Sequence, residues 1–127
     1  MIVAVDFDGV LCKNEFPDIG CPNFEVVALI KELIRKGHEV VLWTSRNGEE
    51  LARAVQWCSA KELYFHAINA PAPSNQATYR DKYPVESRKV YADIYIDDHN
   101  LECICCGEDP AEHIAKCLRR ILENEQR

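Results

Sequence analysis

The hydrophobic positions of this chain fall into four short runs that alternate with segments of helical periodicity. The runs are mainly apolar and rich in β-branched or aromatic residues, which is typical of buried strands. They cover residues 2–5, 40–43, 63–68 and 90–96. Strands that alternate with helices predict an α/β fold with a parallel sheet, helices on both faces and right-handed crossovers. We infer the strand order 3-2-1-4, a Rossmann-like, doubly wound, three-layer α/β/α arrangement.

Three segments place apolar residues on one face of a helix. The first runs from Asn23, its predicted cap, to Gly37, its predicted stop. The second starts at Asn47 with Glu50 three residues on, a pattern similar to a capping box. The third starts near residues 109–110, where an Asp-Pro pair suits the first turn of a helix.

Two segments show no sustained period and are predicted to be loops. They cover residues 10–22, which follow the first strand, and residues 69–84, which are rich in proline. Long loops in compact domains are usually functional or mobile. We therefore expect both segments to lie over a site.

Composition narrows the class of protein. The chain has 127 residues, 47% of them hydrophobic and 28% charged, which predicts one globular domain over residues 1–127. A formal net charge of −6 argues against tight, non-specific binding to nucleic acid. The first strand begins at residue 2 and no apolar run approaches the length of a membrane span, so we expect a cytoplasmic protein with no membrane partner. Seven cysteines in that setting indicate reduced thiols.

Residues that could take part in catalysis or bind a metal directly follow the first strand. Asp6 and Asp8 are spaced i, i+2, and Gly9 follows them. Residues two apart on an extended chain point the same way, so these carboxylates could converge at the carboxyl edge of the sheet, where α/β folds bind ligands. Two like charges at such a short distance share either a proton or a cation, and a site made only of oxygen ligands favours a hard metal such as Mg²⁺. Taken alone, the same residues also suit an ordinary Asp/Gly turn.

Polar residues end two further strands. The second strand runs into residues 44–46, Thr-Ser-Arg, and the fourth ends at the acidic pair Asp97-Asp98. In the inferred order the first strand lies between these two, so the three polar clusters meet in one crevice. Adjacent acids at the end of a buried strand repel each other unless a cation lies between them.

These features together resemble the haloacid dehalogenase superfamily. Its four sequence motifs are present in order: D-x-D-G after the first strand, Thr44 after the second, Lys89, and a strand that ends in Asp97-Asp98. The resemblance spans residues 2 to about 100. A set of four motifs is far more specific than any one of them, each of which alone has an ordinary structural explanation.

The resemblance assigns roles to the motif residues. Asp6 is implied as the nucleophile, Asp8 as the general acid and base, and Lys89 as the charge that steadies nucleophile and phosphate. Thr44 is implied as a ligand of a phosphoryl oxygen, and the neighbouring Ser45 and Arg46 are expected to touch substrate. Mg²⁺ is implied as the cofactor, with four carboxylates around it, of which Asp98 is favoured over Asp97 as the direct ligand: Asp6, Asp8, Asp97 and Asp98.

The resemblance also implies a function. It points to a magnesium-dependent phosphohydrolase, a phosphomonoesterase that acts through an aspartyl-phosphate on Asp6, and an aspartate at position 8 favours a phosphatase or phosphomutase. Neither interval between the motifs has room for a cap domain, so we expect a small member without a cap and with an open active site. Loops, or a second subunit of a homo-oligomer, would cover that site. The phosphorylated substrate stays unidentified. A phosphotransferase or mutase, and a non-catalytic phosphate- or metal-binding module, stay open as alternatives.

A group of cysteines near the carboxyl end has residue types that bind zinc. Its members are Cys103, Cys105, Cys106, His113 and Cys117. The spacing is not that of a standard zinc finger, and Cys117 also fits the apolar stripe of its helix. We expect no bound zinc.

Overall fold

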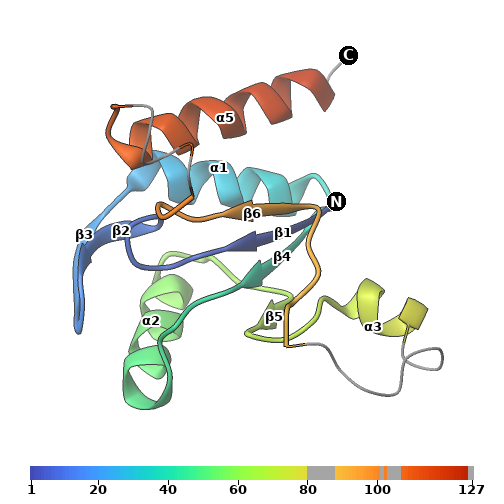
Figure 1. Cartoon of the computed structure of the whole chain (residues 1–127), viewed down its shortest axis with the longest axis horizontal. Coiled ribbons are helices and arrows are strands. Elements are labelled where there is room, and N and C mark those ends of the chain that lie inside the picture. Colours follow the sequence, from blue (N-terminus) through green and yellow to red (C-terminus); the bar gives the residue numbers. More distant parts are fainter. Residues whose placement is uncertain (80–87, 101, 103–106, 126–127) are drawn as a thin grey trace.

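The computed structural model of the protein describes residues 1–79, 88–100, 102 and 107–125. Four strands form a parallel sheet in the order β5-β4-β1-β6 (Figure 1). They are β1 (Ile2–Val5), β4 (Glu39–Leu42), β5 (Ala67–Ile68) and β6 (Ile94–Ile96). The order is the predicted 3-2-1-4, and the α/β class is confirmed. β1 pairs with both β4 and β6, which puts the ends of all three side by side.

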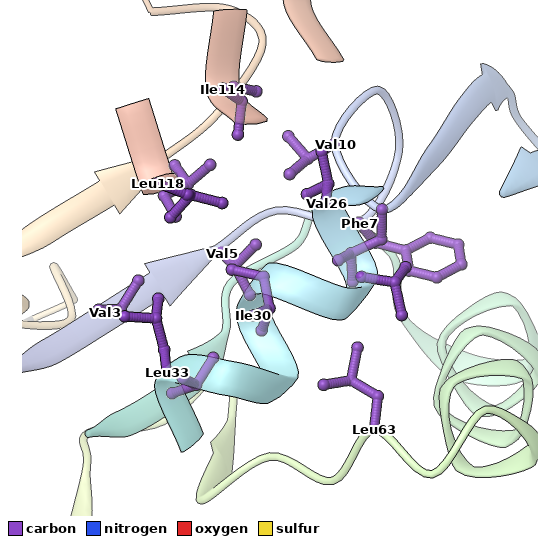
Figure 2. Close-up of a cluster of buried hydrophobic side chains, with 14 of the residues drawn as sticks. Val3, Val5, Phe7, Val10, Val26, Ile30, Leu33, Leu63, Ile114 and Leu118 are labelled. Carbon is purple, nitrogen blue, oxygen red and sulfur yellow. The ribbon is translucent and has the colours of Figure 1, made fainter. Parts of the chain in front are cut away.

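The main hydrophobic core lies between the sheet and three helices. These are α1 (Phe24–Arg35), α2 (Gly48–Ala60) and α5 (Pro110–Glu125). Val3 and Val5 of β1 pack in one cluster with Ile30 of α1 and Leu118 of α5 (Figure 2). Each fully buried aliphatic side chain of this kind contributes about 1.5–3 kcal/mol to folding.

The opposite face of the sheet has a smaller apolar cluster. Because side chains alternate along a strand, Ile2 and Ala4 point away from α1 and pack with Val41. Ala72, just before α3 (Pro73–Tyr79), and Val90 cover this cluster. The described parts of the chain between β5 and β6 therefore form the third layer.

Both ends of α1 are as predicted, but the side-chain bond expected at its start is missing. The Gly37 N–H bonds to the Ile34 carbonyl at 3.0 Å with a φ of +93°, a conformation that glycine adopts without steric cost. Asn23 occupies the cap position without a side-chain cap bond, and its Nδ2 donates instead to the Val10 carbonyl at 2.8 Å. The side chain fastens the helix to the segment after β1. Asn47 likewise makes no side-chain cap bond, so the capping-box prediction for α2 is wrong.

The prediction of a loop over residues 10–22 is wrong. β2 (Cys12–Glu15) and β3 (Asp18–Pro22) form an antiparallel hairpin that projects from the domain (Figure 1). Most of its residues are exposed, so the alternation of apolar and polar positions that reveals a half-buried strand is missing. The hairpin is the insertion between β1 and α1, and no cap domain is present in the described ranges.

Strands β5 and β6 are shorter than the predicted strands over residues 63–68 and 90–96. The predicted loop over residues 69–84 contains the helix α3. Residues 80–84 of that loop lie outside the described part. Leu63 is buried in the core, but its N–H bonds to the Cys58 carbonyl and closes the end of α2. Val90 is buried too, although the ladder of β6 starts only at Ile94. These segments are apolar because they are buried, and they are buried without pairing as strands. Of the helices that the structure describes, none has both the length and the hydropathy to cross a membrane.

The core cluster predicts a graded stability test. Ile30 is fully buried beneath the sheet, whereas its neighbour Leu29 is only partly buried. Ile30→Ala should lower the free energy of unfolding in urea by about 2–5 kcal/mol, through lost transfer energy and the cavity it leaves. The matched control Leu29→Ala should cost clearly less, and equal losses would contradict this packing.

Candidate active site

Three aspartates from two neighbouring strands meet at the carboxyl edge of the sheet. Asp6 continues β1, and its N–H donates to the Ile96 carbonyl of β6 at 2.9 Å. Asp97 and Asp98 directly follow β6. Each of the three offers a carboxylate oxygen, and these oxygens all lie within 4.8 Å of one another. The side chains are partly buried, so water screens their mutual repulsion only in part.

The protonation behaviour of the cluster reflects this crowding. Burial raises the pKa of Asp6 to about 7; a hydrogen bond from the Phe7 N–H opposes the shift, and repulsion from Asp97, Asp98 and Asp8 adds to it. Burial, together with a hydrogen bond with Asp97, also raises the pKa of Asp98. The site therefore holds more negative charge than its surroundings stabilise, and either a proton or a cation relieves it.

The donor set fits a metal ion. Oδ1 of Asp98 is buried and has no hydrogen-bond partner within the described part of the chain. Burial of an unsatisfied charged oxygen is costly, and a cation at the cluster would satisfy it. All three groups offer carboxylate oxygens, the ligands that hard divalent cations prefer. The three-aspartate cluster could thus bind a metal ion.

Gly9 makes room for Asp98. Its φ is +83°, and a Cβ at this position would overlap the Asp98 carboxylate. A side chain here would be strained by the backbone and would also push Asp98 out of the cluster. The glycine that follows the two aspartates in sequence therefore permits a close approach between the segment after β1 and the segment after β6.

Asp8 lies outside the three-carboxylate cluster and pairs with Arg46. Nε of Arg46 donates to Oδ2 of Asp8 at 2.7 Å, and Nη2 donates to Oδ1 at 2.8 Å. The two residues lie 38 positions apart, after the neighbouring strands β1 and β4. Sequence spacing did not reveal this pair, although the inferred strand order already placed an arginine beside an acidic edge.

Thr44, Ser45 and Lys89 lie at the same edge. Thr44 follows β4, its N–H donates to Oδ1 of Asn69 at 2.8 Å, and its Oγ1 accepts from the Arg46 N–H at 3.1 Å. Ser45 is exposed. The roles implied for these side chains stay predictions.

A cavity of about 290 Å³ adjoins the cluster. It is lined by Asp6 and Asp97 of the cluster, by Lys89, and by the aromatic side chains of Trp43 and Tyr95, among others. Nζ of Lys89 lies 5.4 Å from the centroid of the Tyr95 ring. A basic group thus shares one hollow with two of the three carboxylates.

Only part of the cysteine group falls in the described residues. Sγ of Cys117 lies 3.8 Å from Nε2 of His113, and Nε2 of His113 lies 3.5 Å from a Glu102 carboxylate oxygen. Cys103, Cys105 and Cys106 lie outside the described residues. The expectation that no zinc binds here stays a prediction.

Comparison with known proteins adds a relative. No protein-family model and no curated protein matches the chain. A solved structure of a conserved protein from Bacteroides thetaiotaomicron is 33% identical over 94% of this chain and 90% of that one, with a TM-score of 0.74. The chain belongs to the family of that protein.

The raised pKa of Asp6 predicts how stability depends on pH. The folded protein keeps the Asp6 proton up to about pH 7, whereas the unfolded chain releases it near the ordinary value of 3.8. The free energy of unfolding of the metal-free protein therefore falls as pH rises from about 4 to about 7, and Asp6→Asn lacks this loss. In EDTA at about pH 8, urea denaturation should find the variant about 1–2 kcal/mol more stable, a value reduced for solvent screening. Identical pH profiles would contradict the crowding of charge.

Gly9→Ala should abolish stabilisation by a divalent cation. Displacement of Asp98 removes one of the three carboxylates, so the Tm of the variant should no longer rise when Mg²⁺ is added. The matched control is Gly37→Ala, because Gly37 also has a positive φ but no atom within 4 Å of an added Cβ. The control should lose about 1 kcal/mol and keep its response to the cation. A response in Gly9→Ala equal to that of the control would overturn the role of Gly9.

Proposed function

We propose that the protein is a magnesium-dependent phosphomonoesterase of the haloacid dehalogenase type, with Asp6 as its nucleophile. The observation that carries this proposal is the convergence of Asp6, Asp97 and Asp98 at one sheet edge, where a buried Asp98 oxygen has no hydrogen-bond partner among the described residues. Lys89 lines a cavity with Asp6, and Thr44 follows the adjacent strand β4. A nucleophile, a cation site, a basic group and a hydroxyl at one edge are what phosphoryl transfer requires.

Each residue has a defined step in this proposal. A carboxylate oxygen of Asp6 attacks phosphorus as the bond to the leaving oxygen breaks, and that oxygen takes a proton from Asp8. Water then attacks the phosphorus of the aspartyl-phosphate and gives a proton to Asp8, which frees Asp6 and releases inorganic phosphate. Lys89 and Thr44 bind the non-bridging oxygens. Mg²⁺, when bound by the three aspartates, supplies positive charge against the phosphate and keeps Asp6 ionised.

One observation favours a second candidate, a module that binds phosphate or metal without turnover. Both Asp8 oxygens accept hydrogen bonds from Arg46, a pairing that a purely structural ion pair would also show. A phosphotransferase or mutase would share the whole site and differ only in the acceptor. Addition of an alcohol acceptor separates that case from hydrolysis, because it would receive the phosphoryl group in place of water.

Hydrolysis of p-nitrophenyl phosphate tests the proposal. Wild-type activity should require Mg²⁺, vanish in EDTA and vanish in Asp6→Asn, which keeps the shape of the side chain but removes its charge. Glu123→Gln, the matched loss of one charge on the exposed face of α5, should leave the activity unchanged. Activity that survives Asp6→Asn would rule out Asp6 as the nucleophile. Metal binding without turnover of any phosphate ester would favour the non-catalytic module.

A further inference from the structure

Arg46 is a buried charge at the edge of the candidate active site. Its side chain is 1% exposed, and that of its partner Asp8 is 14% exposed. The guanidinium lies between two aromatic rings, with Cζ 5.1 Å from the ring centroids of both Phe7 and Phe16. A buried charge that lacks partners is severely destabilising, so the contacts of Arg46 decide what it does here.

Every N–H donor of Arg46 has an acceptor. Nε and Nη2 bond to the two oxygens of Asp8, and the remaining hydrogens go to backbone carbonyls. Nη1 donates to the Pro17 and Glu50 carbonyls at 3.2 and 3.4 Å, and Nη2 also donates to the Asp18 carbonyl at 2.9 Å. A guanidinium has five N–H donors, so none is left for a phosphoryl oxygen.

These contacts join three parts of the chain. Pro17 lies in the turn between β2 and β3 and Asp18 is the first residue of β3, while Asp8 follows β1 and Glu50 lies in α2. The bidentate pairing fixes both the position and the plane of the Asp8 carboxylate, because two parallel hydrogen bonds allow one relative orientation. Arg46 therefore holds Asp8 and the hairpin turn as one unit.

We propose that Arg46 is a positioning residue that sets the orientation of Asp8 and does not bind the phosphoryl group. The inference rests on the proposed function, in which Asp8 protonates the leaving oxygen. It replaces the expectation that Arg46 touches substrate. Lysine cannot reproduce the effect, since a single ammonium lacks the planar fork that matches a carboxylate.

The proposal predicts a dependence on the leaving group. A poor leaving group such as phenolate needs proton donation, whereas 2,4-dinitrophenolate departs without it. The ratio kcat/KM reports the steps up to formation of the aspartyl-phosphate, so it isolates the proton donation from the later hydrolysis. Misplacement of Asp8 should therefore lower kcat/KM for phenyl phosphate and leave that for 2,4-dinitrophenyl phosphate nearly unchanged.

The experiment compares both esters in wild type, Arg46→Lys, Asp8→Asn and the double variant. We expect Arg46→Lys to lower kcat/KM for phenyl phosphate about tenfold to a hundredfold, within the range of general acid catalysis, and to change the dinitrophenyl ester less than about threefold. The double variant should be no worse than Asp8→Asn alone. Arg53→Lys on α2, an exposed arginine, is the matched control and should match wild type on both esters. The ratio of the two kcat/KM values does not depend on the folded fraction, so partial unfolding cannot mimic the result.

The outcomes separate the two proposals. If wild type hydrolyses neither ester, the proposed function fails and the role of Arg46 fails with it. If wild type hydrolyses both and Arg46→Lys loses activity equally on both, the proposed function stands and the positioning role is overturned, because contact with the phosphoryl group or general damage affects both esters. Losses in the double variant that add to those of Asp8→Asn would also overturn it.

Discussion

Repulsion among Asp6, Asp97 and Asp98 is the constraint on which the site depends. The three carboxylates are brought together by strand pairing and not by attraction for one another, since β1 and β6 bond through their backbones. The folded protein therefore loses part of its stability at this cluster: burial, and to a smaller extent repulsion between the carboxylates, raises the pKa values of Asp6 and Asp98. A group of charges that destabilises the free protein is a common sign of a functional site, because a ligand can relieve it.

The fourth carboxylate at this edge of the sheet, Asp8, has a different environment. Asp8 forms an ion pair with Arg46, whereas the three carboxylates of the cluster lie close to one another. This division separates a cluster that could bind a metal ion from a carboxylate held in one orientation. With no cap domain in the described ranges, the β2–β3 hairpin is the element beside the site, and Arg46 joins its turn to Asp8. Specificity would then depend on the hairpin, on the substrate or on a second subunit.

The sheet could be predicted because its central strands β1 and β4 are buried on both faces and are therefore apolar, and because polar residues follow the carboxyl ends of β1, β4 and β6. That was enough to bring Asp6, Asp97 and Asp98 together. The hairpin could not be predicted, because exposed strands carry no alternation of apolar residues. The Asp8–Arg46 pair depends on the hairpin, since the carbonyls of Pro17 and Asp18 help hold the guanidinium in place. The side-chain cap bond of Asn23 could not be predicted for a similar reason. Its side chain donates instead to the carbonyl of Val10, which is distant in sequence.

The central claim is that Asp6 receives a phosphoryl group beside a cation held by the three aspartates. A crystal structure of the protein with Mg²⁺ and beryllofluoride, a mimic of a phosphoryl group on a carboxylate, tests this most directly. The account predicts beryllium bonded to a carboxylate oxygen of Asp6, Mg²⁺ bound to Asp98 within the cluster, and Lys89 and Thr44 on the fluorides. Beryllofluoride on another residue, or Mg²⁺ bound away from the three aspartates, would contradict it.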